Sequence, residues 1–327
     1  MKSAHRVLMV SAVAIILAGL ASGVFISSAL HAALNDALLT GSIKSASGEK
    51  MGGVTVSAKM EGRTITTTVF TDEQGDYYFP PMGAGKYQVW AQADTFETAR
   101  AGIELSATRH QDFVLQPMKD FARQLTGDQL LSSLPEDTPE DRRMKRVFRN
   151  NCTSCHQPNY ILQNRFDADG WIAIMNAMRD FTVTGTYNGD DAPVQPTIEY
   201  FKKDLAAYLA KVRGPGPTTM KFKIRPRPTG DAARAVFTEY EVPLDPSIGY
   251  ETQYPTNNGS DWSLGTPSTM NGSHGVHDAQ ADFNGNIWYS NNVSSHAISL
   301  GRIDAKTGEV RYPPVRPARP GCTRPAD

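Results

Sequence analysis

The chain has 327 residues, a formal net charge of −1 and a hydrophobic fraction of 40%. This near-neutral charge balance argues against binding to nucleic acid or to an acidic membrane surface. The length suffices for two or three domains, and the three cysteines are too few for a disulfide framework.

Residues 1–33 predict an export segment. Lys2 and Arg6 precede an apolar run over residues 7–30, and small alanines follow that run. We expect a cleaved secretory signal. A run of about 20 apolar residues is also long enough to remain as a membrane anchor. Either way, the rest of the chain is expected outside the cytoplasm, in the periplasm or an equivalent compartment.

Residues 38–117 predict a β-sandwich. Apolar and small polar residues alternate over 54–58, 64–70 and 87–91, and turn residues rich in glycine separate these runs. Short alternating strands with such turns are typical of a small antiparallel sandwich.

The same segment resembles a known family. The runs LTGSIKSASGEKMGGVTVSA and TDEQGDYYFPPMGAGKYQVWA resemble the carboxypeptidase regulatory-like domain, a transthyretin-like sandwich. The resemblance implies no catalytic residues here, because this family carries none of its own; related sandwiches bind carbohydrate or act as spacers. Four aromatic residues are either a glycan-binding surface or core and cross-strand pairs: Tyr77, Tyr78, Tyr87 and Trp90.

A helix is predicted after a polar linker over residues 118–135. Thr138 followed by Pro139 is typical of an N-cap with proline in the first helical turn. The helix should end near Cys152. Its apolar side carries Met144, Val147 and Phe148.

The run CTSCH at residues 152–156 is the attachment signature of a c-type haem. Residues three and four apart share one face of a helix, so Cys152 and Cys155 can reach the two vinyl groups while His156 faces the iron. A structural zinc site commonly needs four ligands in two pairs, and the only other cysteine is the distant Cys322. A thioredoxin-like pair opens a helix, whereas this pair closes one. We therefore predict one covalently bound haem c.

Residues 136–213 predict a small all-α cytochrome c domain. After the haem motif, residues 170–181 and 197–212 have the apolar spacing of amphipathic helices. The run GWIAIMNAMRDF resembles the tryptophan-then-methionine region of haem c domains attached to quinoprotein dehydrogenases and related periplasmic cytochromes. The run DLAAYLAKVRGPGP resembles the closing helix of the same domains.

This resemblance implies His156 and Met178 as the axial ligands of the haem iron, because the ligand methionine of those domains lies two turns after the tryptophan. Met175 is the alternative sixth ligand, and His110 is a weaker one. Small cytochromes c commonly use a methionine sulfur, which raises the reduction potential. The haem pocket is expected to include Phe148 and Trp171 against the porphyrin, and Arg165 as a propionate partner or else a surface charge.

A Pro/Gly linker is predicted over residues 214–231, before a β-rich segment at 232–314. The runs VHDAQADFNGNIWYSNN and SLGRIDAKTGEVRYPP resemble one blade of a streptogramin lyase-like (virginiamycin B lyase-like) β-propeller. A closed propeller needs about four to eight blades of roughly 40 residues, and this chain has room for about one or two. Residues 315–327 predict a disordered or truncated tail. Nothing here matches the metal and catalytic residues that the lyase family places in later blades.

The expected fold class is therefore multidomain: a transthyretin-like sandwich, an all-α cytochrome c domain and an incomplete propeller segment. The expected function is one-electron transfer by an exported mono-haem protein, with redox donor and acceptor proteins or a quinoprotein-like dehydrogenase as partners. No intrinsic catalysis is expected. A membrane partner is expected only if the N-terminal segment stays uncleaved.

Two alternatives stay open. The chain is the N-terminal part of a cytochrome–propeller enzyme, a dehydrogenase or lyase-like protein, whose catalytic blades are missing. Otherwise it is an exported protein that binds a glycan or another surface through its sandwich.

Overall fold

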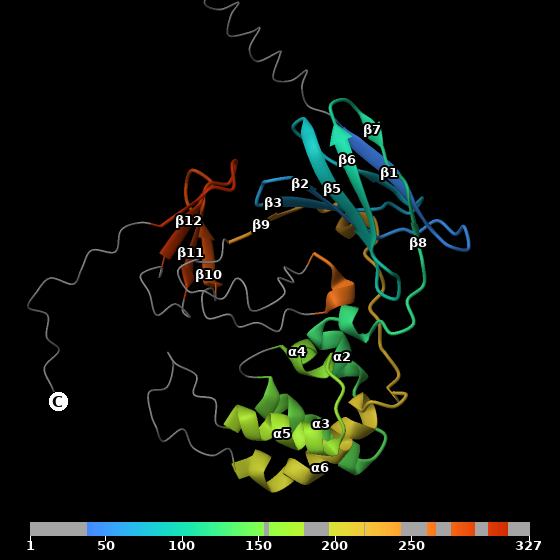
Figure 1. Ribbon diagram of the computed structural model, residues 1–327, viewed down its shortest axis with the longest axis vertical. Helices are drawn as coiled ribbons and strands as arrows, with labels where there is room; N and C mark the ends of the chain where they lie inside the picture. Colours follow the sequence, from blue (N-terminus) through green and yellow to red (C-terminus); the bar gives the residue numbers. More distant parts are fainter. Residues whose placement is uncertain are drawn as a thin grey trace, which may run out of the picture.

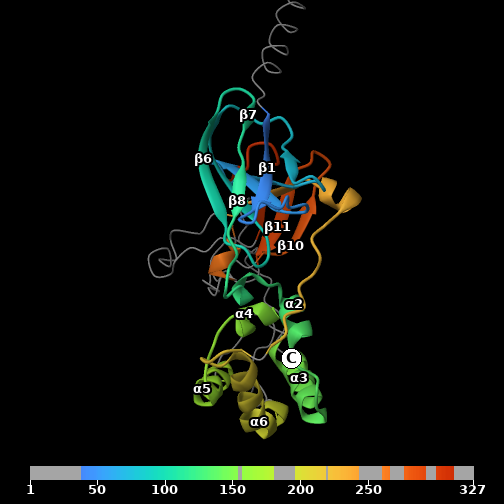
Figure 2. The same cartoon turned by 90° about the vertical axis from the view of Figure 1, so that its right-hand side faces the viewer.

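The computed structural model describes residues 38–153, 157–179, 196–218, 220–242, 260–265, 276–291 and 300–312. Two views at right angles place a group of helices at one end of the molecule and the β-structure at the other (Figures 1 and 2). The predicted leader, the predicted tail, Cys155 and His156 lie outside the described residues.

The N-terminal part consists of two sheets packed against one core, as the alternating pattern predicts. In the first sheet β1 pairs with β4, β7 and β8; in the second the strand order is β6-β5-β2-β3, continued by β9. The second sheet is antiparallel, but β1 of the first pairs antiparallel with β4 and parallel with β7 and β8, which differs from the antiparallel sandwich expected. Apolar residues of both sheets share one buried core, with Leu39, Val56 and Val89 fully buried. The strands are β1 (Leu39–Ser45), β2 (Thr55–Met60), β3 (Ile65–Phe70), β4 (Asp76–Tyr78), β5 (Gly85–Gln92), β6 (Ala99–Leu105), β7 (Arg109–His110) and β8 (Phe113–Leu115).

Three of the four aromatic residues proposed for a glycan surface are buried in this sandwich. Tyr77 is 0% exposed, and Tyr87 and Trp90 are 6% and 4% exposed. Tyr78 is the exposed one, at 62%. Successive side chains of a strand point to opposite faces, so neighbouring Tyr77 and Tyr78 separate into core and surface. The four residues therefore do not form one binding surface.

The strand β9 (Phe237–Tyr240) extends the second sheet from a distant part of the sequence. It pairs antiparallel with β3, with Ile65 opposite Tyr240 and Thr68 opposite Phe237. Its residues fall in the segment that the sequence assigns to the C-terminal β-region. In the structure they form an edge strand of the sandwich, so the chain returns to this sheet after the helices.

The helices between the two β-regions form one unit around a single apolar core (Figure 1). This helical unit extends beyond the predicted 136–213, because Leu125 and Met220, from the two predicted linkers, are also buried in its core. None of the described helices is long and apolar enough to cross a bilayer. The helices are η1 (Ala122–Gln124), α2 (Gly127–Ser133), α3 (Pro139–Cys152), α4 (Pro158–Leu162), α5 (Ala168–Arg179) and α6 (Pro196–Arg213).

The C-terminal strands form a four-stranded antiparallel sheet in the order of the sequence. Its last hairpin turns at Gly308, whose φ of 72° suits glycine. Gly308 lies so close to the sandwich that an added Cβ would be 2.5 Å from the Thr64 hydroxyl oxygen. The hydroxyl of Tyr240 also donates a hydrogen bond to the Ala305 carbonyl oxygen at 2.8 Å. The strands are β10 (Val276–Ala281), β11 (Ile287–Asn291), β12 (Leu300–Ile303) and β13 (Val310–Arg311).

Candidate functional site

Helix α3 carries the first residue of the CTSCH run at its C-terminal end. The helix starts as predicted: Thr138 is its N-cap, its hydroxyl oxygen accepts a hydrogen bond from the Asp141 amide at 3.0 Å, and Pro139 occupies the first turn. The apolar stripe also lies where the pattern predicts, with Met144, Val147 and Phe148 buried against the other helices. Cys152 is therefore fixed by a well-anchored helix.

The thiol of Cys152 is not arranged as a reactive thiolate. It packs against the helical core, and burial raises its pKa to about 12. It also ends a helix, where the macrodipole disfavours negative charge. Nucleophilic cysteines of dithiol enzymes have lowered pKa values, commonly at helix N-termini. The surroundings of Cys152 thus differ from those of a nucleophilic cysteine in a dithiol enzyme.

Helix α5 brings both candidate methionines to the same helical unit. Trp171, Met175 and Met178 follow each other at intervals of four and three, so they lie along one side of the helix. Met175 is 8% exposed and belongs to the core, whereas Met178 is 50% exposed. The Met175 side chain is already used in packing, and the Met178 thioether is free of the core.

Two large aromatic residues line this part of the core. Phe148 is 0% exposed, and Trp171 is 1% exposed with its ring edge-to-face against Phe166 at 5.2 Å. The indole Nε1–H of Trp171 is buried without a hydrogen-bond acceptor among the described residues. A buried donor of this kind usually has a partner, so a polar group of a ligand fits here.

Arg165 is held by the protein itself. Its guanidinium donates to the carbonyl oxygens of Gly214 at 2.9 Å, Pro215 at 3.0 Å and Gly216, and it faces Asp120 at 3.7 Å. These contacts join the segment before α5 to the end of α6. Arg165 is therefore a weaker candidate for a haem propionate than the sequence alone indicates.

An ion pair between a buried carboxylate and a half-exposed lysine, unforeseen from the sequence, joins α3 to α6. Asp141 is 5% exposed and accepts a hydrogen bond from the Lys211 Nζ at 3.1 Å. Burial opposes the ionisation of Asp141, but hydrogen bonds from Thr138 and Lys211 outweigh it, so its pKa lies below the ordinary 3.8. A carboxyl with a lowered pKa stabilises the fold above the unfolded pKa and loses that contribution as the pH falls through the folded pKa.

Replacing Asp141 with asparagine is therefore expected to destabilise the helical unit at neutral pH by about 2 kcal/mol, the scale of a hydrogen bond to a charged group. The difference from the wild type should shrink below the ordinary pKa of 3.8. Urea unfolding of both proteins at pH 7 and pH 3, followed by the circular dichroism signal of the helices, measures this difference in stability. An equal difference at both pH values would contradict this assignment.

The described ranges hold no group of three or more His, Cys, Asp or Glu side chains placed to bind a metal ion. The CTSCH run, with Cys155 and His156 outside those ranges, is thus the candidate centre of this chain. The residues that are described fit a covalently held haem. They supply a partly buried thiol at a helix end, two buried aromatic rings, an accessible thioether on α5 and a buried indole N–H with no acceptor among the described residues.

The N-terminal part is a small sandwich of two sheets. Residues 39–116 match the carboxypeptidase regulatory-like domain family. This part of the chain is such a domain, as its sequence predicts. No curated protein matches the chain.

Solved structures align with about a quarter of the chain. Chlorocatechol 1,2-dioxygenase from Pseudomonas putida is 13% identical over 25% of this chain and 60% of its own, with a TM-score of 0.21. The Bacillus anthracis TIE protein is 12% identical over 26% of this chain and 17% of its own, with a TM-score of 0.22. The aligned part covers less than two thirds of either protein.

Proposed function

We propose that this chain is an exported electron-transfer protein with a single haem c. Cys152 and Cys155 would hold the haem covalently, and His156 and Met178 would ligate its iron. The observation that carries the proposal is the position of Cys152, partly buried at the C-terminal end of an amphipathic helix and packed against the same core as the methionine-bearing α5. The group supplies reversible one-electron chemistry at the iron, and the chain supplies its attachment, ligands and surroundings.

The choice of Met178 over Met175 follows from packing. Turning Met175 toward a ligand would leave a cavity in a close-packed core. Met178 is 50% exposed and can be reoriented without opening such a cavity. Phe148 and Trp171 would exclude water from one side of the haem, and the Trp171 indole N–H would donate to a polar haem substituent. A methionine ligand and a low-polarity pocket both raise a haem potential.

Expression in cells that mature c-type cytochromes tests the proposal. We expect a reduced spectrum with the α-band of haem c, and colour that resists extraction with acidified acetone. Replacing Cys152 and Cys155 together with alanine should abolish the covalent haem, and replacing Cys322 with serine should not. Haem that is extracted by acetone, or none bound at all, would overturn the proposal.

A second candidate function has one supporting observation, the four-stranded C-terminal sheet. Four antiparallel strands in sequence order are the make-up of one propeller blade. On this alternative the haem would carry electrons out of a larger enzyme whose substrate site lies on further blades. Both candidates predict that this chain alone is spectroscopically active and catalytically silent. Reduction of the haem that depends on a substrate, in a protein that also includes further blades, would favour the enzyme, and reduction by a donor protein alone would favour electron transfer.

A further inference from the structure

Two segments that follow the helical unit return to the carboxypeptidase regulatory-like domain, although the family match ends at residue 116. The first is β9 with Glu241, and the second is the short helix η4 (Trp262–Leu264) with its N-cap Asp261. We call residues 237–242 and 260–265 the return segment. Each part contacts a different place on the sandwich.

The first contact completes the edge of the sheet. β9 pairs with β3 through residues 237–240, and the Glu241 amide continues the pairing by donating to the Thr64 carbonyl oxygen at 2.8 Å. The Glu241 carboxylate accepts from the Lys59 Nζ at 2.5 Å. An unpaired sheet edge is a template for an added strand, and here the chain itself provides that strand.

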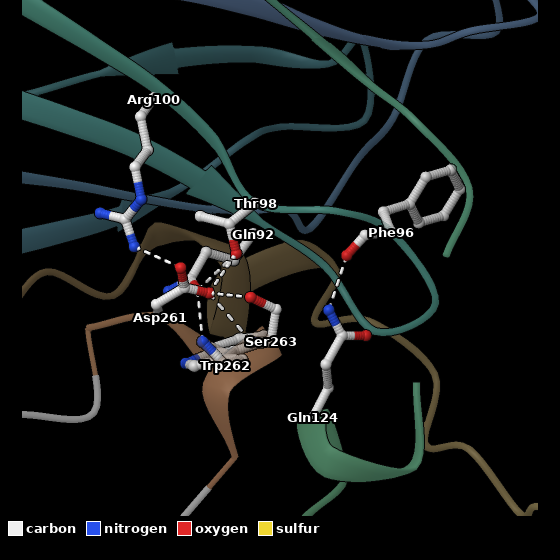
Figure 3. A network of polar contacts seen from close by, with 8 residues as sticks. All are labelled: Gln92, Phe96, Thr98, Arg100, Gln124, Asp261, Trp262 and Ser263. Atoms are coloured by element: carbon white, nitrogen blue, oxygen red, sulfur yellow. Dashed lines mark hydrogen bonds and ion pairs between the residues drawn. The ribbon is translucent and has the colours of Figure 1, made fainter. Parts of the chain in front are cut away.

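The second contact is a polar network around Asp261, drawn in Figure 3. Its carboxylate faces Arg100 at 2.9 Å and accepts a hydrogen bond from the Thr98 hydroxyl at 2.9 Å. The Trp262 amide donates to the Gln92 Oε1 at 2.9 Å. Thr98 directly precedes β6, Arg100 lies in its first residues and Gln92 ends β5, so this network covers the loop between the two strands.

The same loop also holds the start of the helical unit. The Thr95 amide donates to the Gln124 Oε1 at 2.9 Å. The Gln124 Nε2 donates to the Phe96 carbonyl oxygen at 2.6 Å (Figure 3). The Asp94 carboxylate accepts from the Gln129 Nε2 of α2 at 2.8 Å. Thr95 has a φ of 74°, a strained conformation for threonine that persists only where surrounding contacts enforce it.

We propose that the carboxypeptidase regulatory-like domain serves here as an internal docking module that binds the return segment at two points. The chain on both sides of the helical unit is thereby attached to the same domain, an arrangement we call the two-point clasp. The charges are complementary at both points: the sandwich contributes Lys59 and Arg100, and the return segment contributes Glu241 and Asp261. The sandwich surface around Lys59 and Arg100 thus binds an acidic segment of the same chain, the return segment. This inference does not depend on a bound haem.

Two contacts on one tethered segment strengthen each other. When one point is bound, the other is held at a high effective concentration and rebinds readily. Loss of either point should therefore loosen the other, even though the two contacts share no side chain. Two contacts that merely coexist would respond independently.

Amide hydrogen exchange of the full-length protein tests this coupling. Asp261→Asn removes the charge at the second point, and Glu239→Pro removes a β9 amide that faces β3, two residues before the Glu241 amide that donates to Thr64. We expect each variant to speed exchange at the distant point, and at α2, by about fivefold or more, because opening one point lowers the effective concentration at the other. The control Glu140→Gln breaks the exposed pair with Arg143 on α3 and should change neither point.

A charge reversal keeps the test decisive if the proline variant does not fold. Arg100→Asp and Asp261→Arg should each speed exchange over β9, and the two together should restore slow exchange. Faster exchange confined to the altered contact, or no rescue in the double variant, would overturn the two-point clasp. The haem extraction test of the proposed function is unaffected by either result.

Discussion

Replacing Met178 with alanine is expected to abolish the near-infrared sulfur-to-iron absorption band of the oxidised protein while leaving the haem covalently attached. Loss of a thioether ligand lowers the reduction potential, because methionine favours the reduced iron. A fall on the order of 0.1 V is expected within the roughly 0.8 V range that axial ligands span. Absorption spectroscopy of the oxidised protein and a potentiometric titration measure the two effects.

Met175→Ala is the matched comparison, since it removes the same side chain one turn away. Met175 is 8% exposed, so this variant should keep the band but lose about 2–5 kcal/mol of stability, as for other buried methionines replaced by alanine. Loss of the band only in Met175→Ala would transfer the ligand role to Met175. A band that persists in both single variants would place the sixth ligand outside α5.

Local patterns accounted for the elements whose side chains interact within a few residues. The N-cap Thr138, the adjacent Pro139 and the stripe ending at Phe148 are all short-range signals, and the helix α3 follows them. The alternation over 87–91 likewise gives buried positions of β5, such as Tyr87 and Val89. These features depend on helix and strand periodicity alone.

The helix α2 was missed although its sequence carried a signal. Thr126 and Gln129 form a reciprocal capping box, with the Gln129 side chain accepting from the Thr126 amide at 2.8 Å. The spacing threonine-x-x-glutamine before a leucine pair is a recognisable helix start. Its polar surroundings led to the assignment of a linker instead.

Contacts between distant segments left no such signal. Nothing in the residues around Phe237 specifies β3 as a partner, because strand register depends on which face and edge the fold makes available. The burial of Trp90 could not be predicted from alternation either. Trp90 is 4% exposed although its neighbours Val89 and Ala91, which point to the other face of the strand, are also buried. Its second face is covered by the Arg100 guanidinium, 5.8 Å from the ring centre, and Arg100 is in turn held by Asp261.

The candidate site also has a part that local sequence indicates and a part that depends on contacts between distant segments. The CTSCH run and the helix before it were readable from sequence, whereas the difference between Met175 and Met178 required their burial. The role of Arg165 also depended on packing, since its carbonyl partners Gly214 and Pro215 lie about 50 residues away in the chain. The motif itself is visible in the sequence, whereas the burial of the side chains around it follows only from packing.

Phe148→Ala should give the largest stability loss in the helical unit. The side chain is 0% exposed and lies one turn before Cys152 on the same helix, so its removal leaves a cavity beside the attachment point. Substitutions of buried phenylalanine by alanine cost about 3–5 kcal/mol. Amide exchange over α3 and α6 is the suitable measurement, because a multidomain chain has no single unfolding transition.

Tyr200→Ala is the control for this cavity. Tyr200 is 81% exposed on α6 and keeps only a ring contact with Phe201 at 4.7 Å, so its loss should cost about 1 kcal/mol or less. If Phe148 borders the haem, its alanine variant should also lower the amount of covalent haem recovered, and the control should not. Unchanged exchange over α3 in Phe148→Ala would mean that this side chain supports neither the core nor the attachment site, and the proposed pocket would then have to be sought on another face of α5.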